Sequence, residues 1–262
     1  MKTARPSSAV ILIREIKKKI EVFLGQRHKG GTFPSAFVFP GGVLSTEDSL
    51  VTSQCNEQNQ DAINKLLSVK SDGLKYYSAA IRELFEETGV LLALKSDGKW
   101  VSEKTNNFYQ QLKKNQKELS SGQMLWSEFV TSSKIILATN KLYYLGHWET
   151  PISLKARFTT RFFLAELPPN QKAHHDGDEL VDSKWLEPIK ALDFHNNGKI
   201  ELPFPHMKHL ETLADFSTPE SLRNWALNRA RGPIKKVRPW ITDEGGKRKF
   251  ILPWESDYPD NA

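Results

Sequence analysis

The sequence predicts an α/β or α+β sandwich. Short β-branched strand segments occur along the chain together with longer segments that have helical periodicity, but they do not follow the regular strand–helix–strand order of a doubly wound sheet. Hydrophobic residues make up 39% of the 262-residue chain and aromatic residues 10%. This is enough apolar side chain for a core, so a wholly disordered chain is excluded.

The N-terminal elements are strands. Residues 9–13 and 20–24 are apolar runs separated by Lys17, Lys18 and Lys19, which predicts a hairpin with a charged turn. Residues 37–39 form a third short strand, which ends at Pro40-Gly41-Gly42.

Helices follow in the middle of the chain. Residues 45–71 are polar, with a short helix expected at 61–69, and the strongest helix spans about 76–88 before Gly89, a natural C-cap. A helical insert is expected at about 104–130.

Strands are expected again at residues 143–148, 157–167 and 180–186, and a short helix at 189–192. We therefore predict one domain over residues 1–195. Residues 196–262 then form a C-terminal extension packed on that domain, with helices at 206–216 and 219–229 and short strands in the tail.

Composition limits the function classes. Lys and Arg outnumber Asp and Glu by 37 to 31, a net charge of +6 that fits an anionic substrate, non-specific nucleic-acid contact or simple solubility. Cys55 is the only cysteine, which excludes an intrachain disulfide and a cysteine-based zinc site. The apolar run at 10–13 is too short for a signal peptide or membrane span, and the C-terminus is not a Ser-Lys-Leu address, so we expect a soluble, cytoplasmic protein.

The strongest helix carries the chemistry. Glu83, Glu86 and Glu87 are spaced i, i+3 and i+4 and therefore share one helix face, where their charges repel. Arg82 is the one positive neighbour. A hard divalent cation such as Mg²⁺ would relieve the repulsion, because it prefers oxygen ligands and commonly bridges to phosphates. An ordinary acidic, solvated helix face remains the alternative.

Residues 82–90, Arg-Glu-Leu-Phe-Glu-Glu-Thr-Gly-Val, resemble the second half of the Nudix signature, Gly-x5-Glu-x7-Arg-Glu-U-x-Glu-Glu-x-Gly-U, in which U is an aliphatic residue. Residues 39–42, Phe-Pro-Gly-Gly, resemble its start. Two departures are present. Asp48 stands where the signature has glutamate, with Glu47 beside it, and about 26 residues are inserted before Glu83. Residues from about 49 to 75 should bulge out of the loop that precedes the helix, at a small cost in loop entropy.

An insertion at this place resembles the coenzyme A diphosphatase branch of the Nudix hydrolases, the peroxisomal type and its bacterial relatives. Residues 34–44, 146–151 and 157–163 resemble the same branch. The resemblance implies a Nudix-type α/β/α sandwich with a mixed sheet. It also implies a hydrolase that cuts a diphosphate bond in a small nucleotide-diphosphate substrate with the help of Mg²⁺ or Mn²⁺.

The resemblance also implies residue roles. Glu83 would orient or deprotonate the attacking water, while Arg82 would hold the helix to its loop through Asp48 or Glu86 rather than touch substrate. Glu179, in the segment before residue 180, is our choice for the last catalytic glutamate, although a solvated turn acid is an equal interpretation. The implied metal ligands are Glu83, Glu86, Glu87 and the Gly42 carbonyl.

Three arginines are candidates for binding substrate phosphates: Arg27, Arg157 and Arg161. A structural salt bridge is at least as good an interpretation for each. Trp148 and Phe158 could stack on an adenine, but strand aromatics are more often core residues. His174 and His175 are adjacent, yet no third ligand in the motif supports a metal site there.

The favoured substrate is coenzyme A or an acyl-CoA, by analogy with the branch. An ADP-ribose or NAD(H) pyrophosphatase is a second enzyme hypothesis, and the lack of a proline between Pro40 and Pro151 counts against it. A non-catalytic Nudix-fold module that binds nucleotide or RNA is the third, but such modules usually lose the signature glutamates. We expect neither a membrane nor a nucleic-acid partner, and the sequence leaves the oligomeric state open.

Overall fold

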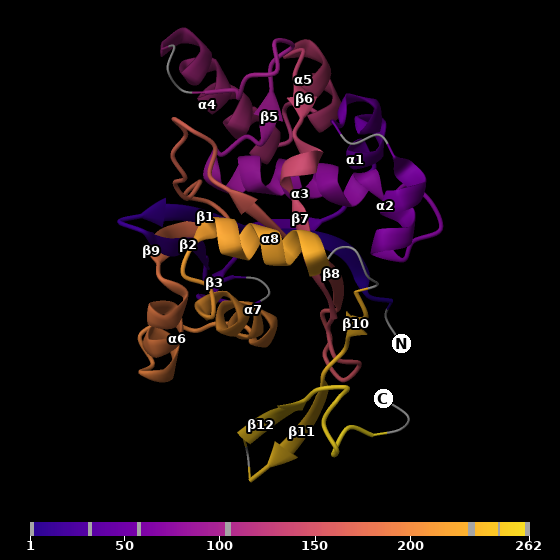
Figure 1. Cartoon of the computed structure of the whole chain (residues 1–262), viewed down its shortest axis with the longest axis vertical. Coiled ribbons are helices and arrows are strands. Elements are labelled where there is room, and N and C mark those ends of the chain that lie inside the picture. Colours follow the sequence, from indigo (N-terminus) through magenta and orange to yellow (C-terminus); the bar gives the residue numbers. More distant parts are fainter. Residues whose placement is uncertain are drawn as a thin grey trace.

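A computed structural model describes residues 3–30, 33–56, 59–102, 106–229, 234–245 and 247–259. Within these ranges, helices cover both faces of an eight-stranded mixed sheet (Figure 1), which confirms the predicted sandwich. The sheet consists of β1 (Arg5–Ile16), β2 (Lys19–Arg27), β3 (Phe37–Val38), β4 (Gly41–Val43), β7 (Tyr143–Glu149), β8 (Phe158–Glu166), β9 (Leu180–Leu186) and β10 (Lys236–Val237).

The helices fall into two groups on either side of the sheet (Figure 1). One face is covered by α1 (Glu47–Leu50), α2 (Gln60–Leu67), α3 (Leu74–Thr88), α4 (Asn106–Ser120) and α5 (Trp126–Ser132). The other is covered by α6 (Pro188–Asn196), α7 (Phe204–Ala214) and α8 (Pro219–Arg229). Smaller elements are η1 (Thr52–Gln54), η2 (Thr139–Lys141), the pair β5 (Ala93–Leu94) and β6 (Ile136–Leu137), and the hairpin β11 (Trp240–Glu244) and β12 (Lys247–Ile251).

Strand β1 organises the sheet. One edge of it pairs in parallel with β8, while the other edge pairs with β2 at residues 13–16 and with β4 at residues 7–9. Strand β2 in turn pairs with β3 and β9. The two strands of the first hairpin therefore diverge, and the chain from β3 to β4 fills the space between them, which brings the Pro-Gly-Gly bend into the sheet.

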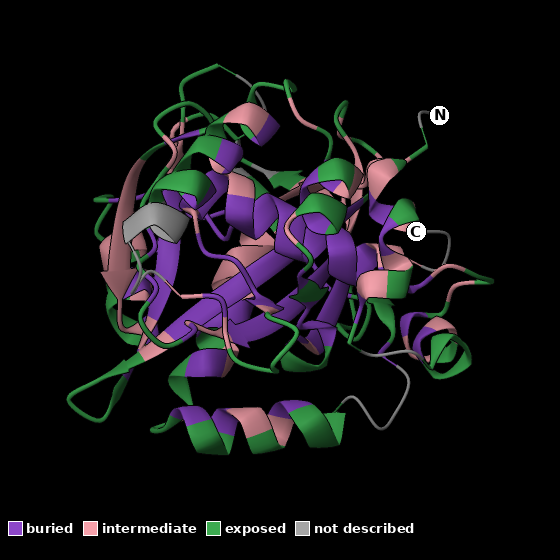
Figure 2. Ribbon diagram, turned by 90° about the horizontal axis from the view of Figure 1, so that it is seen from above, coloured by how far each residue is buried: buried purple, intermediate pink, exposed green. Residues whose placement is uncertain are grey.

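The alternation of side chains along β1 divides the core in two. Val10 and Leu12 face the α3 side, whereas Ile11 and Ile13 face the α7 side, and all four are fully buried. Figure 2 shows the buried residues concentrated in the sheet and on the inner faces of the covering helices. Since both faces of the strand are buried, its apolar residues form a continuous run rather than an alternating pattern.

The predicted strands and helices are present, with shifted ends. The inserted segment, residues 49–75, contains the expected short helix, α2, and it also buries Val51, Cys55, Ile63 and Leu67 in the α3-side core. Helix α1 and strand β4 were not predicted. Parts of the predicted segments lie outside the described residues: 31–32 of the loop before β3, 57–58 of the insertion, 104–105 of the helical insert, and 230–233, 246 and 260–262 of the C-terminal extension.

The C-terminal extension contributes to the second core. Leu202, Leu210, Leu213 and Leu222 are buried there with residues of β1 and β2. In the described part of the chain, every helix is too short or too polar to cross a lipid bilayer.

Candidate active site

Helix α3 places the three glutamates on one face. Ile81, Leu84 and Phe85 on its other side are fully buried in the α3-side core, which fixes the rotation of the helix. The helix ends at Gly89, which has a φ of 73° and donates its N–H to the carbonyl of Phe85 at 2.8 Å. The signature glycine thus stops the helix directly after the acidic face.

The Pro-Gly-Gly bend lies against this face. The N–H of Gly41 donates to Oε2 of Glu87 at 3.1 Å. A Cβ on Gly42 would lie 2.5 Å from the carboxyl carbon of Glu83, and a Cβ on Gly41 would overlap the backbone carbonyl of Ser8. Both glycines therefore permit a close approach that no other residue allows, and the two halves of the signature meet despite the insertion between them.

Arg82 joins the loop before α3 to the acidic face. Its guanidinium donates to both oxygens of the fully buried Asp48, at 2.9 and 3.1 Å, and to the carbonyl of Val43 at 3.0 Å. It also donates to Oε1 of Glu83 at 2.7 Å and to Oε2 of Glu86 at 3.3 Å. Both partners anticipated for Arg82 are thus engaged. Asp48 stands at the position where the signature has glutamate, and Asp48 rather than Glu47 is the partner of Arg82.

Burial shifts the titration of the glutamates. It raises the pKa of Glu83 to about 7, with the charge of Arg82 opposing the shift. Burial also raises the pKa of Glu86, and it raises the pKa of Glu87 well above its ordinary value, where the negative charges of Glu83 and Glu179 add to the effect. Perturbed carboxylates gathered in a cleft are typical of functional sites.

A cavity of about 390 Å³ opens beside Glu83, and we call it the signature cleft. Its wall combines the glycine bend, two acidic and two basic side chains and several aromatic rings. The lining residues are Arg5, Ser7, Ser8, Ala9, Arg27, Phe33, Val38, Phe39, Gly41, Gly42, Val43, Glu83, Phe158, Thr160, Phe162, Glu179 and His206.

The structure brings Glu179 and Arg27 to this cleft, as the sequence interpretation requires for their roles. Glu179 is exposed at its edge, and its charge acts on all three glutamates of α3. Arg27 ends β2, on the same wall.

Arg157 and Arg161 are not brought to the signature cleft. The guanidinium of Arg157 donates to Oε1 of Glu149 at 2.9 Å. Arg161 is 4% exposed, donates to the carbonyl of Leu67 at 2.9 Å and stacks 4.0 Å above the ring of Tyr76. Arg161 belongs to β8 and Arg157 directly precedes this strand. Because each guanidinium is engaged by partners away from the cleft, the structure gives no support to a substrate role for either.

Several cleft residues were not identified as site residues from the sequence, among them Arg5, Phe33 and His206. Arg5 begins β1 and lies 4.8 Å from the ring centroid of Phe158, which also lines the cleft. His206 comes from α7 in the C-terminal extension, and its ring stacks on Phe39 at 4.7 Å. No local sequence pattern marks these residues. His206, for example, reaches the bend only because the C-terminal extension packs against the sheet.

The residues present fit a hard divalent cation. Glu83 and Glu87 both lie against the glycine bend and offer the carboxylate oxygens that such an ion prefers. Oε1 of Glu87 is buried without a hydrogen-bond partner in the described part of the chain. An orphaned buried carboxylate oxygen is costly unless a ligand completes it. Among the described residues no three His, Cys, Asp or Glu side chains are already arranged to hold a metal ion, and Arg82 engages one oxygen each of Glu83 and Glu86.

Comparison with known proteins agrees with this geometry. The family described as the NUDT19 Nudix domain matches residues 57–213. The acyl-coenzyme A diphosphatase NUDT19 of Xenopus laevis is 26% identical over 276 residues, which cover 92% of this chain and 72% of the frog protein. The protein of the same name from Homo sapiens is 27% identical over 46% of this chain and 33% of its own length.

A solved structure shares the fold. The crystal structure of a NUDIX hydrolase from Alicyclobacillus acidocaldarius superposes with a TM-score of 0.71 at 23% identity, covering 86% of this chain and 97% of that one. The family match spans more than half of the chain and includes the whole of α3. The chain is therefore a member of the Nudix hydrolases, in the group defined by the NUDT19 Nudix domain.

Proposed function

We propose that this Nudix hydrolase cuts the diphosphate bond of coenzyme A or an acyl-CoA, with Mg²⁺ or Mn²⁺, to give 3′,5′-ADP and a phosphopantetheine. The observation that carries the hydrolytic part is the meeting of Glu83 and Glu87 with the glycine bend at an open cleft. The choice of substrate is supported by the similarity to acyl-coenzyme A diphosphatases.

In this proposal Glu83, Glu86, Glu87 and the carbonyl of Gly42 hold the divalent ions. The bound ions would neutralise the diphosphate and lower the pKa of a water. Glu87 is suited to this role because one of its oxygens has no hydrogen-bond partner among the residues that the structure describes.

Glu83 is the proposed base for the attacking water, because its carboxylate lies against the glycine bend and lines the signature cleft. Water then adds to a phosphorus atom of the diphosphate, the bond from that phosphorus to the bridging oxygen breaks, and the bridging oxygen leaves with the other phosphate.

The remaining residues orient the substrate. Arg27 faces the same cleft and offers a planar, bidentate donor to a phosphate oxygen. Glu179, at the edge, is the proposed last acid of the site. Arg82 positions the carboxylates of Glu83 and Glu86 through hydrogen bonds, and its own guanidinium is held in place by the buried Asp48.

The proposal predicts that Glu87→Gln abolishes hydrolysis while the protein stays folded. The substitution keeps the size of the side chain but removes its charge. Products from a panel of CoA, acetyl-CoA, ADP-ribose, NADH, diadenosine polyphosphates and dNTPs would be identified by mass, with Mg²⁺ or Mn²⁺, and folding would be checked by circular dichroism. Chelation of the metal should abolish turnover, and Mg²⁺ or Mn²⁺ should restore it.

Glu128→Gln is the matched control, since Glu128 is an exposed acid on α5. It should retain wild-type turnover. Wild-type turnover by Glu87→Gln would refute the site. If the protein cut ADP-ribose but not CoA esters, the substrate assignment would be refuted, whereas the assignment of the site residues would stand.

A further inference from the structure

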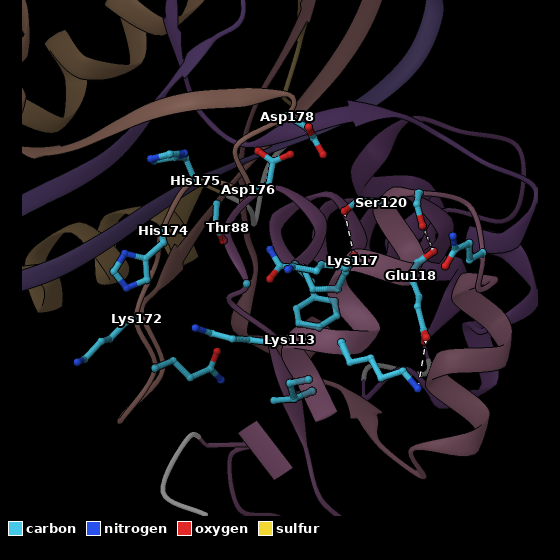
Figure 3. A pocket seen from close by; sticks show the side chains of 18 residues that line it. Thr88, Lys113, Lys117, Glu118, Ser120, Lys172, His174, His175, Asp176 and Asp178 are labelled. Atoms are coloured by element: carbon cyan, nitrogen blue, oxygen red, sulfur yellow. Dashed lines mark hydrogen bonds and ion pairs between the residues drawn. The ribbon is translucent and has the colours of Figure 1, made fainter. Parts of the chain in front are cut away.

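A cavity larger than the signature cleft, with a volume of about 790 Å³, opens between α4 and residues 171–178 (Figure 3). Lysines line it together with the acids Glu118, Asp176 and Asp178, so its charges nearly balance and favour no particular ligand. The signature cleft is smaller, but its wall includes His206, which carries a buried polar atom without a partner among the described residues. This histidine comes from the C-terminal extension and takes no part in the hydrolytic step proposed for the acidic residues.

Aromatic rings hold the imidazole of His206 in place. It stacks on Phe39 with ring centroids 4.7 Å apart and an interplanar angle of 21°, and it lies perpendicular to Phe162 at 5.7 Å. Phe39 directly precedes the Pro-Gly-Gly bend, and both phenylalanines also line the signature cleft. The position of the imidazole is therefore fixed relative to the bend.

The two ring nitrogens of His206 have different surroundings. Its Nδ1 is buried without a hydrogen-bond partner in the described part of the chain. A neutral imidazole has one N–H donor and one acceptor nitrogen, and a buried N–H without an acceptor is rarer in proteins than an unsatisfied lone pair. This favours the tautomer with the hydrogen on Nε2. Since the residue is only half-buried and lines the cleft, the Nε2 edge of the ring is the edge left for a ligand.

The surroundings of His206 also keep the ring neutral. Burial lowers the pKa of His206 to about 3, and the charges of His209 and Arg27 add to the effect. His206 lies in the first turn of α7, where the partial positive charge of the helix disfavours an imidazolium and favours an anionic ligand. At neutral pH the ring is therefore a hydrogen-bond donor rather than a cation.

Arg27 links His206 to the acidic face of α3. The positive charge of Arg27 acts on both Glu87 and His206, and Arg27, Glu83 and His206 line the same cavity. A phosphate bound by Arg27 has further acceptor oxygens. His206 supplies a donor for them from the α7 side of the cleft.

We propose that the Nε2–H of His206 donates a hydrogen bond to a phosphate oxygen of the substrate diphosphate, so that the C-terminal extension supplies a binding residue. The inference rests on the proposed function as a diphosphatase, but it concerns the diphosphate itself and not the groups attached to it. A donor that binds substrate and transition state equally lowers KM and leaves kcat unchanged.

Kinetics of three variants test this role. His206→Phe keeps a ring beside Phe39 but removes both nitrogens, and it should raise KM for CoA about tenfold, as expected for the loss of a hydrogen bond to a charged group, with kcat unchanged. His206→Gln carries an amide N–H donor near the position of Nε2 and should recover most of the loss. The control is His209→Leu, on the same helix but outside the signature cleft, which should retain both constants. An unchanged KM in His206→Phe, or an equal loss in His209→Leu, would overturn the inference.

Binding of ADP separates the inference from the proposed function. ADP contains a diphosphate but lacks the pantetheine arm and the 3′-phosphate of CoA. Calorimetry with Mg²⁺ should show that ADP binds to His206→Phe about tenfold more weakly than to wild type. If CoA is not cut but this difference is found, the proposed function fails and the inference stands. If CoA is cut but ADP binds equally to wild type and variant, or not at all to wild type, the inference fails and the proposed function stands.

Discussion

Gly41 and Gly42 are adjacent, but different neighbours exclude a side chain at each. At Gly42 the obstacle is the carboxyl group of Glu83, at the end of a flexible side chain. At Gly41 it is backbone of β1, including the carbonyl of Ser8, which cannot move without breaking the sheet. Glycine is therefore required at position 41 by the packing of the sheet and at position 42 by the close approach of Glu83 in the candidate active site.

We predict that Gly42→Ala lowers kcat at least about tenfold with little loss of stability, because the new methyl group displaces the Glu83 carboxylate from its place at the bend. Steady-state kinetics and thermal unfolding would measure the two effects. Gly41→Ala is the comparison and should lower the melting temperature clearly. If Gly42→Ala kept full activity, the close approach of Glu83 to the bend would not matter for catalysis.

At the scale of elements, helix α3 and the loop from β4 to α1 are held together through one buried arginine. Asp48 on α1 is fully buried and its carboxylate depends on Arg82 and on the N–H of Ser45, which donates at 2.7 Å. The neighbouring Glu47 instead accepts from Ser127 of α5. The two adjacent acids thus attach α1 to different helices.

We predict that Asp48→Ala lowers the free energy of unfolding by about 3 kcal/mol, since it leaves the buried Arg82 without its main partner. Urea denaturation followed by fluorescence of the tryptophans would measure this loss. Glu47→Ala removes only hydrogen bonds to Ser127 and should cost about 1 kcal/mol. A larger loss in Glu47→Ala than in Asp48→Ala would contradict the assignment of Asp48 as the partner of the arginine.

At the scale of the whole molecule, the sheet carries a core on each face, and the second core contains a buried histidine. His209 of α7 is 7% exposed, its ring lies 4.5 Å from that of Phe162, and its Nε2 has no hydrogen-bond partner in the described chain. Burial lowers the pKa of His209 to about 3, and the charge of Arg229 adds to the effect. The folded protein therefore keeps this ring neutral.

This histidine should make the protein acid-sensitive. The unfolded chain binds a proton on His209 below about pH 6.5, and the folded protein does not until about pH 3, so stability is lost as the pH falls through that window. His209→Leu should reduce the slope of the free energy of unfolding against pH by about 1.4 kcal/mol for each pH unit within the window. Urea denaturation from pH 7 to pH 4 would measure both slopes.

The glutamates of α3 act in the opposite direction, because their raised pKa values let the folded protein hold protons that the unfolded chain releases as the pH rises. They are present in wild type and in His209→Leu, so their contribution cancels in the difference between the two slopes. That difference reports His209 together with its effect on His206, whose pKa the charge of His209 helps to lower. Identical slopes would show that His209 does not remain neutral in the folded protein.

The sequence by itself determined the acidic helix and its end. Helical spacing depends on neighbours three and four residues away, so the shared face of Glu83, Glu86 and Glu87 follows from the order of residues alone. The C-cap at Gly89 is equally local. The strands followed from their β-branched, apolar composition, and the signature pattern indicated the family that the comparisons show.

Only the tertiary structure decided which distant residues share the signature cleft. Nothing in the sequence distinguishes Arg27, Arg157 and Arg161 as phosphate-binding candidates. In the structure Arg27 lines the signature cleft, whereas Arg157 pairs with Glu149 and Arg161 is buried against Leu67. His206 reaches the signature cleft from α7, a part of the chain far from the signature. Such neighbours depend on strand pairing and packing between remote segments, and no local pattern of residues records those contacts.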